Sequence, residues 1–344
     1  MTVPFHRVVT TDAEIAAVTE AMRSGWWTSG PQVRAFEQEF AARVGARHAI
    51  AVSSGTMGAL VALSALGVGP GTRVAVPVWT FSGPAMMAWR LGATIVPCDV
   101  AYGSLNLVEG PPCDIVMPTH FAGLRVSLWG DPQGVRLDDA AHAFPVPGVG
   151  VNARVTFFSF YATKTLATGE GGMLTTDDDG LAAHMRQLRQ HGFSAPVDDR
   201  PTPLYDIVVP GWKANMSDLT AALGRVQLAT ADERLAARRA IALRYSTELR
   251  PDIGRPVGHS DHAWHLYVIR VPQRDRFIAA MAARGVQCSV HFVPLHRLRF
   301  WRGVWGPLRF PNADRAHEEA VSLPIFPSMT ESEVSQVIEA ANAC

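Results

Sequence analysis

Lysine is scarce in this sequence. Of its 31 lysine and arginine residues, only Lys164 and Lys213 are lysine, and the other 29 are arginine. A guanidinium stays protonated, whereas an amine can lose its proton and attack a carbonyl carbon. An isolated lysine is more often a remnant of biased composition than a nucleophile, so the surroundings of Lys164 have to decide between these two interpretations.

Several other common signals are absent. The formal net charge is zero, which argues against nucleic acid or an anionic membrane as the main partner. The four cysteines show no C-x-x-C spacing, so neither a zinc site nor a disulfide framework is indicated. No phosphate-loop motif is present and no G-x-G-x-x-G follows a predicted strand, so nucleotide-cofactor sites lack support. No long apolar run or secretory pattern is found, and we expect a cytoplasmic protein.

The first two thirds of the chain alternate short apolar runs with helical patterns. With 344 residues, the chain is long enough for one large and one small domain. Apolar runs of strand length between helical segments are typical of βαβ units and predict a mostly parallel sheet. We expect strands at residues 48–52, 73–77, 94–100, 114–117, 135–138, 155–160 and 173–176.

The pattern changes after a long helical region at residues 215–249, which we interpret as a connector to a second unit. Residues 297–311 are rich in Trp and Pro and predict a loop, whereas the capping box at 330–333 opens a final helix. The chain is thus predicted to hold a large α/β domain over residues 1–235 and a small α+β domain over residues 236–344. The expected elements of the small domain are a strand at 265–271, a helix at 274–284 and a strand at 286–292.

Polar residues gather where predicted strands end, and ligands usually bind at that edge of such a sheet. Asp139 follows one strand, Lys164 lies in the loop after another, and the turn at residues 53–56 opens a helix whose N–H groups suit a phosphate. His120 and His142 are further candidates, although each could serve only local hydrogen bonding. An amine, a carboxylate and a phosphate-binding turn together match the needs of pyridoxal 5′-phosphate (PLP).

The sequence also resembles a known family. The segments TSGPQVRAFEQEFAARVG, RLDDAAHAF, FFSFYATKTLATGEGGMLTT and HLYVIRV follow one another along nearly the whole chain. On these motifs the chain is identified as a member of the DegT/StrS group, which are fold-type I, PLP-dependent aminotransferases of nucleotide-linked keto sugars. The resemblance implies an α/β fold-type I architecture with a large cofactor-binding domain and a smaller C-terminal domain.

The resemblance assigns roles to residues within one subunit. Lys164 would form the Schiff base with the cofactor and afterwards move a proton. Asp139 would hold the protonated ring nitrogen, and His142 would approach the ring hydroxyl. The other cofactor-binding residues that the resemblance implies are Gly55, Thr56, Phe81 and Ser159.

A second subunit is implied as well. The family places a phosphate-binding residue of the partner subunit in a segment that reads GWKANM at residues 211–216 here. Either Lys213 or Asn215 could reach the partner's cofactor, so the resemblance implies a homodimer with a shared active site. The chain departs from the family in carrying Asp138 where Glu is common. The role of His120 stays open between structure and substrate contact.

The implied reaction moves an amino group, with L-glutamate as donor, to the keto group of a nucleotide-linked deoxy sugar. A cyclitol ketone is an alternative acceptor, because the same set of cofactor-binding residues serves enzymes for keto sugars and for cyclitol ketones. A PLP-dependent sugar dehydratase is disfavoured, since such enzymes of the family carry His in place of Lys164. A non-enzymatic PLP-binding regulator is also disfavoured, because the sequence shows no DNA-binding appendage and no net positive charge. The sequence leaves open which nucleotide is linked to the sugar and whether the carbonyl is at C3 or C4. It also leaves open whether Trp26 and Trp27 line a pocket or belong to the core.

Overall fold

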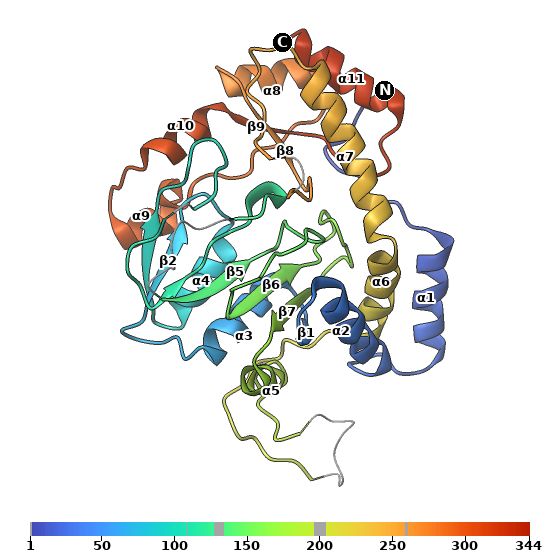
Figure 1. Ribbon diagram of the computed structural model, residues 1–344, viewed down its shortest axis with the longest axis vertical. Coiled ribbons are helices and arrows are strands. Elements are labelled where there is room, and N and C mark those ends of the chain that lie inside the picture. The colour runs from blue at the N-terminus through green and yellow to red at the C-terminus, as the bar shows by residue number, and fades with distance from the viewer. Residues whose placement is uncertain (1, 108, 127–133, 196–203, 259–260) are drawn as a thin grey trace.

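A seven-stranded sheet forms the centre of the protein (Figure 1). The computed structural model describes residues 2–107, 109–126, 134–195, 204–258 and 261–344. The strand order is β1-β7-β6-β5-β4-β2-β3, and only β7 runs antiparallel to its neighbours, so the predicted mostly parallel sheet is confirmed. The strands are β1 (His48–Val52), β2 (Arg73–Pro77), β3 (Thr94–Cys98), β4 (Ile115–Val116), β5 (Val135–Asp139), β6 (Val155–Ser159) and β7 (Gly172–Thr176).

Helices cover both faces of this sheet. Successive strand side chains point to opposite faces, and in β1 Ile50 and Val52 pack with α3, α4 and α5, whereas Ala49 and Ala51 pack with α2 and α6. Both faces therefore carry a buried apolar core, as expected for a sheet between helical layers. The helices are α1 (Asp12–Arg23), α2 (Pro31–Val44), α3 (Gly55–Ala65), α4 (Ser82–Arg90), α5 (Asp179–Leu188) and α6 (Asp218–Ala229).

The predicted helical connector consists of two helices. Helix α6 ends at Ala229, and α7 (Ala231–Glu248) begins after Thr230, whose ψ of 10° departs from helical geometry. Figure 1 shows α6 and α7 running one after the other from the large sheet to the upper part of the molecule. There β8 (Tyr267–Arg270) pairs with β9 (Ala320–Leu323).

This two-stranded sheet has its own apolar core. Helices α7, α8 (Arg274–Ala283) and α11 (Glu331–Asn342) pack on the two strands, and α10 (Pro311–Glu319) leads into β9. The predicted capping box is present at the start of α11, where Thr330 and Glu333 bond each other's backbone N–H. The domain boundary at residues 235 and 236 stays a prediction.

Two expectations for the C-terminal region are wrong. Residues 286–292 form no regular strand, because they make only isolated bridges, Val286 to Val3 and Ser289 to Ser322. The expected loop at 297–311 contains helix α9 (Arg299–Trp305). Its Trp301 is fully buried against the large core, and the indole donates a hydrogen bond to Ser82 Oγ at 2.8 Å.

Short 3-10 turns occur at Phe121–Gly123 and Leu295–Arg297. Within the described ranges, none of the helices combines the length and the apolar character needed to cross a membrane.

Candidate active site

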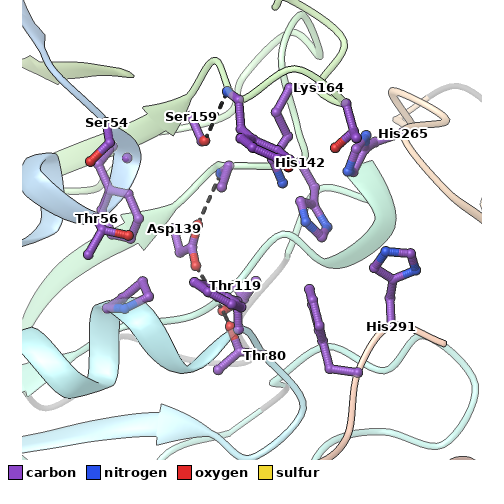
Figure 2. Close-up of a pocket in the computed structure, with 18 of the residues that line it drawn as sticks. Ser54, Thr56, Thr80, Thr119, Asp139, His142, Ser159, Lys164, His265 and His291 are labelled. Atoms are coloured by element: carbon purple, nitrogen blue, oxygen red, sulfur yellow. Dashed lines mark hydrogen bonds between the residues drawn. The ribbon is translucent and has the colours of Figure 1, made fainter. Parts of the chain in front are cut away.

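A cavity of about 470 Å³ opens where β5 and β6 end and α3 begins (Figure 2). All seven residues predicted to contact the cofactor within one subunit line it. They come from separate parts of the chain, and the sheet brings them together because parallel strands end at one edge. These residues are Gly55, Thr56, Phe81, Asp139, His142, Ser159 and Lys164.

Lys164 lies in the loop between β6 and β7. Its backbone N–H donates to Tyr161 O at 2.8 Å, which closes a tight turn and directs the side chain into the cavity. Burial lowers the pKa of the Lys164 amine to about 8, against the opposing charge of Asp139. No protein group in the described ranges hydrogen-bonds to this amine, so it is available to a bound molecule.

Asp139 is the last residue of β5 and is almost fully buried. Oδ1 accepts the N–H of Ala141 at 3.0 Å, and Oδ2 accepts a longer bond of 3.5 Å from Thr119 Oγ1. Burial raises the pKa of Asp139, although Ala141, Lys164 and His120 oppose this shift. A buried carboxylate with so few donors is stabilised by a cationic partner, and a protonated pyridine nitrogen would be one.

The start of α3 forms a cradle for an anion. The Ser54 side chain accepts the N–H of Met57 and caps the helix, which leaves the first N–H groups of Gly55 and Thr56 without intrahelical acceptors. A Cβ at position 55 would lie 2.8 Å from Ser159 Cβ, so only glycine permits this approach of α3 to β6. The N–H groups and the hydroxyls of Thr56 and Ser159 thus border one place that suits a phosphate.

Three imidazoles form the opposite wall of the cavity, those of His142, His265 and His291. His142 Nδ1 accepts the N–H of Ala122 at 3.2 Å, and its ring centre lies 4.3 Å from that of His265. Burial lowers the pKa of all three histidines, and the charge of Lys164 lowers it further. Both effects favour the neutral form of these imidazoles.

Phe81 and Phe292 complete the apolar part of the cavity. Phe81 is exposed at the mouth, and its ring centre lies 6.3 Å from that of Phe292. A ring that is free on one side can pack against a flat ligand.

The two residues expected to serve a second subunit lie outside this cavity. Lys213 Nζ donates to Asn215 Oδ1 at 2.5 Å, and Asn215 Nδ2 donates to Ser29 Oγ at 2.9 Å. Trp26 and Trp27 do not line the cavity either; both are exposed, and their indoles donate to backbone oxygens of neighbouring residues. The role of Lys213 and Asn215 stays a prediction.

His120 is a structural residue. Its imidazole is fully buried, with Nε2 2.9 Å from Asp138 Oδ2 and Nδ1 accepting the N–H of Val126. Arg136 donates two hydrogen bonds to the same Asp138 carboxylate. Burial alone would raise the pKa of Asp138, but His120 and Arg136 lower it. The side chain of Asp138 thus anchors β5 behind the cavity, whereas Asp139 points into it (Figure 2).

Sequence reasoning missed several residues of the cavity. Thr119 and Thr80 form a hydroxyl pair with 2.9 Å between their oxygens, below Asp139. The motif HLYVIRV begins with His265, and Thr119 directly precedes His120. No local pattern, however, distinguishes a threonine or histidine that faces a cavity from one in a core. The lining residues that were not singled out as ligands include Thr80, Thr119, Tyr161, Thr163, Glu170, His265, His291 and Phe292.

The residues of the cavity fit PLP. Lys164 offers an unpaired amine, Asp139 an under-bonded carboxylate and the start of α3 a close-packed anion cradle. These three chemistries are the ones that a cofactor with an aldehyde, a ring nitrogen and a phosphate requires.

Comparison with known proteins agrees with this reading. Residues 9–342 match the DegT/DnrJ/EryC1/StrS aminotransferase family. The chain is 40% identical to the spore coat polysaccharide biosynthesis protein SpsC of Bacillus subtilis, over 95% of this chain and 93% of that protein.

Solved structures give the same result. Spr1654 of Streptococcus pneumoniae, assigned as a sugar aminotransferase, is 26% identical in its PMP form, with a TM-score of 0.91 over 100% of this chain and 97% of that one. A PLP form of the same protein is known. The aminotransferase TlmJ of Streptoalloteichus hindustanus is 30% identical, with a TM-score of 0.88 over 99% and 97% of the two chains.

The fold, the cavity and these comparisons confirm the predicted fold-type I architecture, the aminotransferase class and the PLP cofactor. The chain belongs to the DegT/DnrJ/EryC1/StrS aminotransferase family.

Proposed function

We propose that this enzyme transfers an amino group from L-glutamate to the keto group of a nucleotide-linked deoxy sugar. The family match supports aminotransfer. The similarity to a polysaccharide biosynthesis protein and to a protein assigned as a sugar aminotransferase supports a sugar acceptor. The cytoplasm stays the predicted location.

The observation that carries the proposal is the presence of Lys164 and Asp139 in one cavity. A lysine at this position supports aminotransfer over sugar dehydration, for which the resemblance implies histidine. Its lowered pKa leaves a substantial fraction of the amine neutral near pH 7.5, and only the neutral form can act as a nucleophile or a base.

Each residue of the cavity has a task in this reaction. Bound PLP supplies an aldehyde and an electron-withdrawing ring. The Lys164 amine binds the cofactor and, once released, accepts and returns a proton beside it. The Asp139 carboxylate holds the ring nitrogen in its protonated form, because a buried anion stabilises the adjacent cation. The start of α3, with Thr56 and Ser159, binds the phosphate.

A homodimer is part of the proposal. Lys213 and Asn215 lie together on the surface outside the cavity of their own subunit, where they can serve the phosphate site of a second copy. The segment that leads to them leaves the body of the molecule next to α5 (Figure 1) and exposes large apolar side chains. Such side chains are typical of a surface that a partner covers. The exposed residues are Leu204, Tyr205, Ile207 and Val208.

The test separates the two half-reactions. The PLP-loaded protein is mixed with L-glutamate, and the loss of its visible absorbance band is followed. Keto sugars linked to UDP, GDP or dTDP, and free cyclitol ketones, are then screened for return of the band. We expect return with a nucleotide-linked sugar; return with cyclitols alone would replace the proposed acceptor.

The matched control is Lys164→Ala. This variant is expected to bind PLP without the band of the covalently attached cofactor and to fail in both half-reactions. An unchanged band together with full amino transfer in Lys164→Ala would overturn the assignment of Lys164.

A further inference from the structure

His265 lies in the wall of the active-site cavity and comes from the C-terminal part of the chain. It precedes β8, and only 6% of its surface is exposed. Its ring packs at 4.3 Å against that of His142, and its backbone oxygen accepts a hydrogen bond from the buried Arg238. Figure 2 shows the imidazole across the cavity from Thr56 and Asp139, away from the predicted phosphate cradle.

The neighbouring imidazoles are held by the protein. His142 Nδ1 accepts the N–H of Ala122, and His291 Nδ1 is 3.0 Å from Ser322 Oγ. By contrast, no described residue hydrogen-bonds to either ring nitrogen of His265, and its Nδ1 is enclosed by protein atoms. Nε2 is therefore the nitrogen left to face the cavity.

The enclosure of Nδ1 also indicates the tautomer of His265. A neutral imidazole carries one N–H donor and one acceptor nitrogen. A buried N–H without an acceptor is rarer in proteins than a buried acceptor without a donor. The proton is thus better placed on Nε2, so that His265 presents an N–H donor to the cavity.

The charges around the cavity define the group that this donor would bind. Among the described residues that line the cavity, Lys164 is the only lysine or arginine, and it faces Asp139. A carboxylate bound at the imidazole wall would lack a cationic partner, which is costly in a buried site. A neutral oxygen, such as a sugar hydroxyl, needs only the single N–H that His265 provides.

We propose that His265 is a specificity-determining residue, whose Nε2–H donates a hydrogen bond to a ring hydroxyl of the amino acceptor. This inference rests on the proposed function, since it requires a hydroxylated ketone as acceptor. It assigns recognition of the acceptor, and not of the amino donor or the cofactor, to the C-terminal part of the chain.

Two variants test the inference in the PLP-loaded enzyme. His265→Phe keeps a flat ring but has no donor, and His265→Gln keeps an N–H donor near the position of Nε2. A donor lost from a polar subsite typically reduces discrimination by about 10- to 100-fold. We therefore expect kcat/KM for the keto sugar to fall by about that factor in His265→Phe and to recover in part in His265→Gln.

Two further readouts distinguish recognition from structure. The Kd for PLP, measured by fluorescence titration of the cofactor-free protein, and the half-reaction with L-glutamate should stay within about twofold of wild type. A deoxy analogue that lacks the contacted hydroxyl should react equally with wild type and His265→Phe. His262→Phe is the control, because this buried histidine lies outside the cavity and its ring accepts the N–H of Trp264.

The outcomes are separable. An unchanged acceptor half-reaction in His265→Phe overturns the inference and leaves the proposed function intact. Equal losses in both half-reactions, or a parallel loss of PLP affinity, also overturn it, because His265 would then support the cofactor. If wild type takes an amino group from L-glutamate but no hydroxylated ketone restores the band, the proposed acceptor fails first and the inference fails with it.

Discussion

Lys164 and Asp139 face each other in the active-site cavity, and burial shifts both toward their neutral forms. The Asp139 carboxylate favours the charged amine and Lys164 favours the charged carboxylate, yet burial outweighs this attraction at each group. The pKa of Lys164 is therefore lowered and that of Asp139 is raised. A cationic ring nitrogen beside Asp139 would stabilise its ionised form, which leaves the neutral amine of Lys164 free to react.

The first prediction concerns pH. Because the pKa of Lys164 is about 8 in place of the ordinary 10.5, the neutral fraction of the amine should rise as pH passes through 8. We expect the rate of covalent PLP loading onto the cofactor-free protein to increase from pH 6.5 and to level off above about pH 9. Stopped-flow absorbance measures this rate, and a rate that climbs steadily to pH 10.5 would contradict the lowered pKa.

The second prediction concerns Thr119. Thr119→Val removes one of the two donors to the Asp139 carboxylate and leaves the hydroxyl of Thr80 without its partner. We expect kcat to fall by about 3- to 10-fold, the equivalent of one modest hydrogen bond. Thr119→Ser keeps the hydroxyl and should retain most activity. Equal losses in the two variants would contradict the role of the hydroxyl, because Thr119→Ser keeps it; a loss in Thr119→Ser alone would point to the methyl group.

The third prediction concerns the anion cradle. Gly55→Ala places a Cβ 2.8 Å from Ser159 Cβ, so α3 and β6 have to separate. Such overpacking costs about 1–3 kcal/mol, and we expect the Kd for PLP to rise by about tenfold or more. Gly69→Ala is the control, because nothing lies within 4 Å of an added Cβ there. Fluorescence titration that finds equal PLP affinity in both variants would contradict the role of the close approach.

The fourth prediction concerns the buried charges behind β5. Asp138→Asn leaves the half-buried Arg136 and the buried His120 without their common anion. Loss of one partner from such a group should lower the free energy of unfolding by about 3–5 kcal/mol. Asp252→Asn breaks an exposed ion pair with Arg250 and should cost no more than about 1 kcal/mol. Urea unfolding compares the two variants, and similar midpoints would refute a structural role for Asp138.

The fifth prediction tests the shared active site. Lys164→Ala and a double variant, Lys213→Ala with Asn215→Ala, should each be impaired as homodimers. In a heterodimer of the two, one site combines an intact Lys164 with an intact Lys213 and Asn215 from the other subunit. Random co-assembly should therefore restore about a quarter of wild-type activity, because half of the dimers carry one good site. No recovery in a verified heterodimer would place both functions within one subunit.

Much of the fold follows from local patterns. Apolar runs at residues 48–52 and 73–77 match β1 and β2, because strand length and burial are visible in short stretches of sequence. The capping box at Thr330 likewise marked the start of α11. The prediction of a loop at 297–311 was wrong because the helix there depends on distant contacts and not on a local pattern. The segment is rich in Trp and Pro, which suggested a loop, and only the packing of Trp301 and Trp305 against the large core makes Arg299–Trp305 a helix.

The residues of the candidate site likewise fall into those that the sequence predicted and those that only the structure placed. The sequence by itself determined the candidates, which are a lysine, an aspartate and a small-residue turn, since an amine, an acid at a strand end and small residues before a helix are each readable in place. Only the tertiary structure decided that His120 turns to Asp138 while His265 faces the cavity. Both are histidines next to strands, and what separates them is the set of hydrogen-bond partners that distant parts of the chain supply.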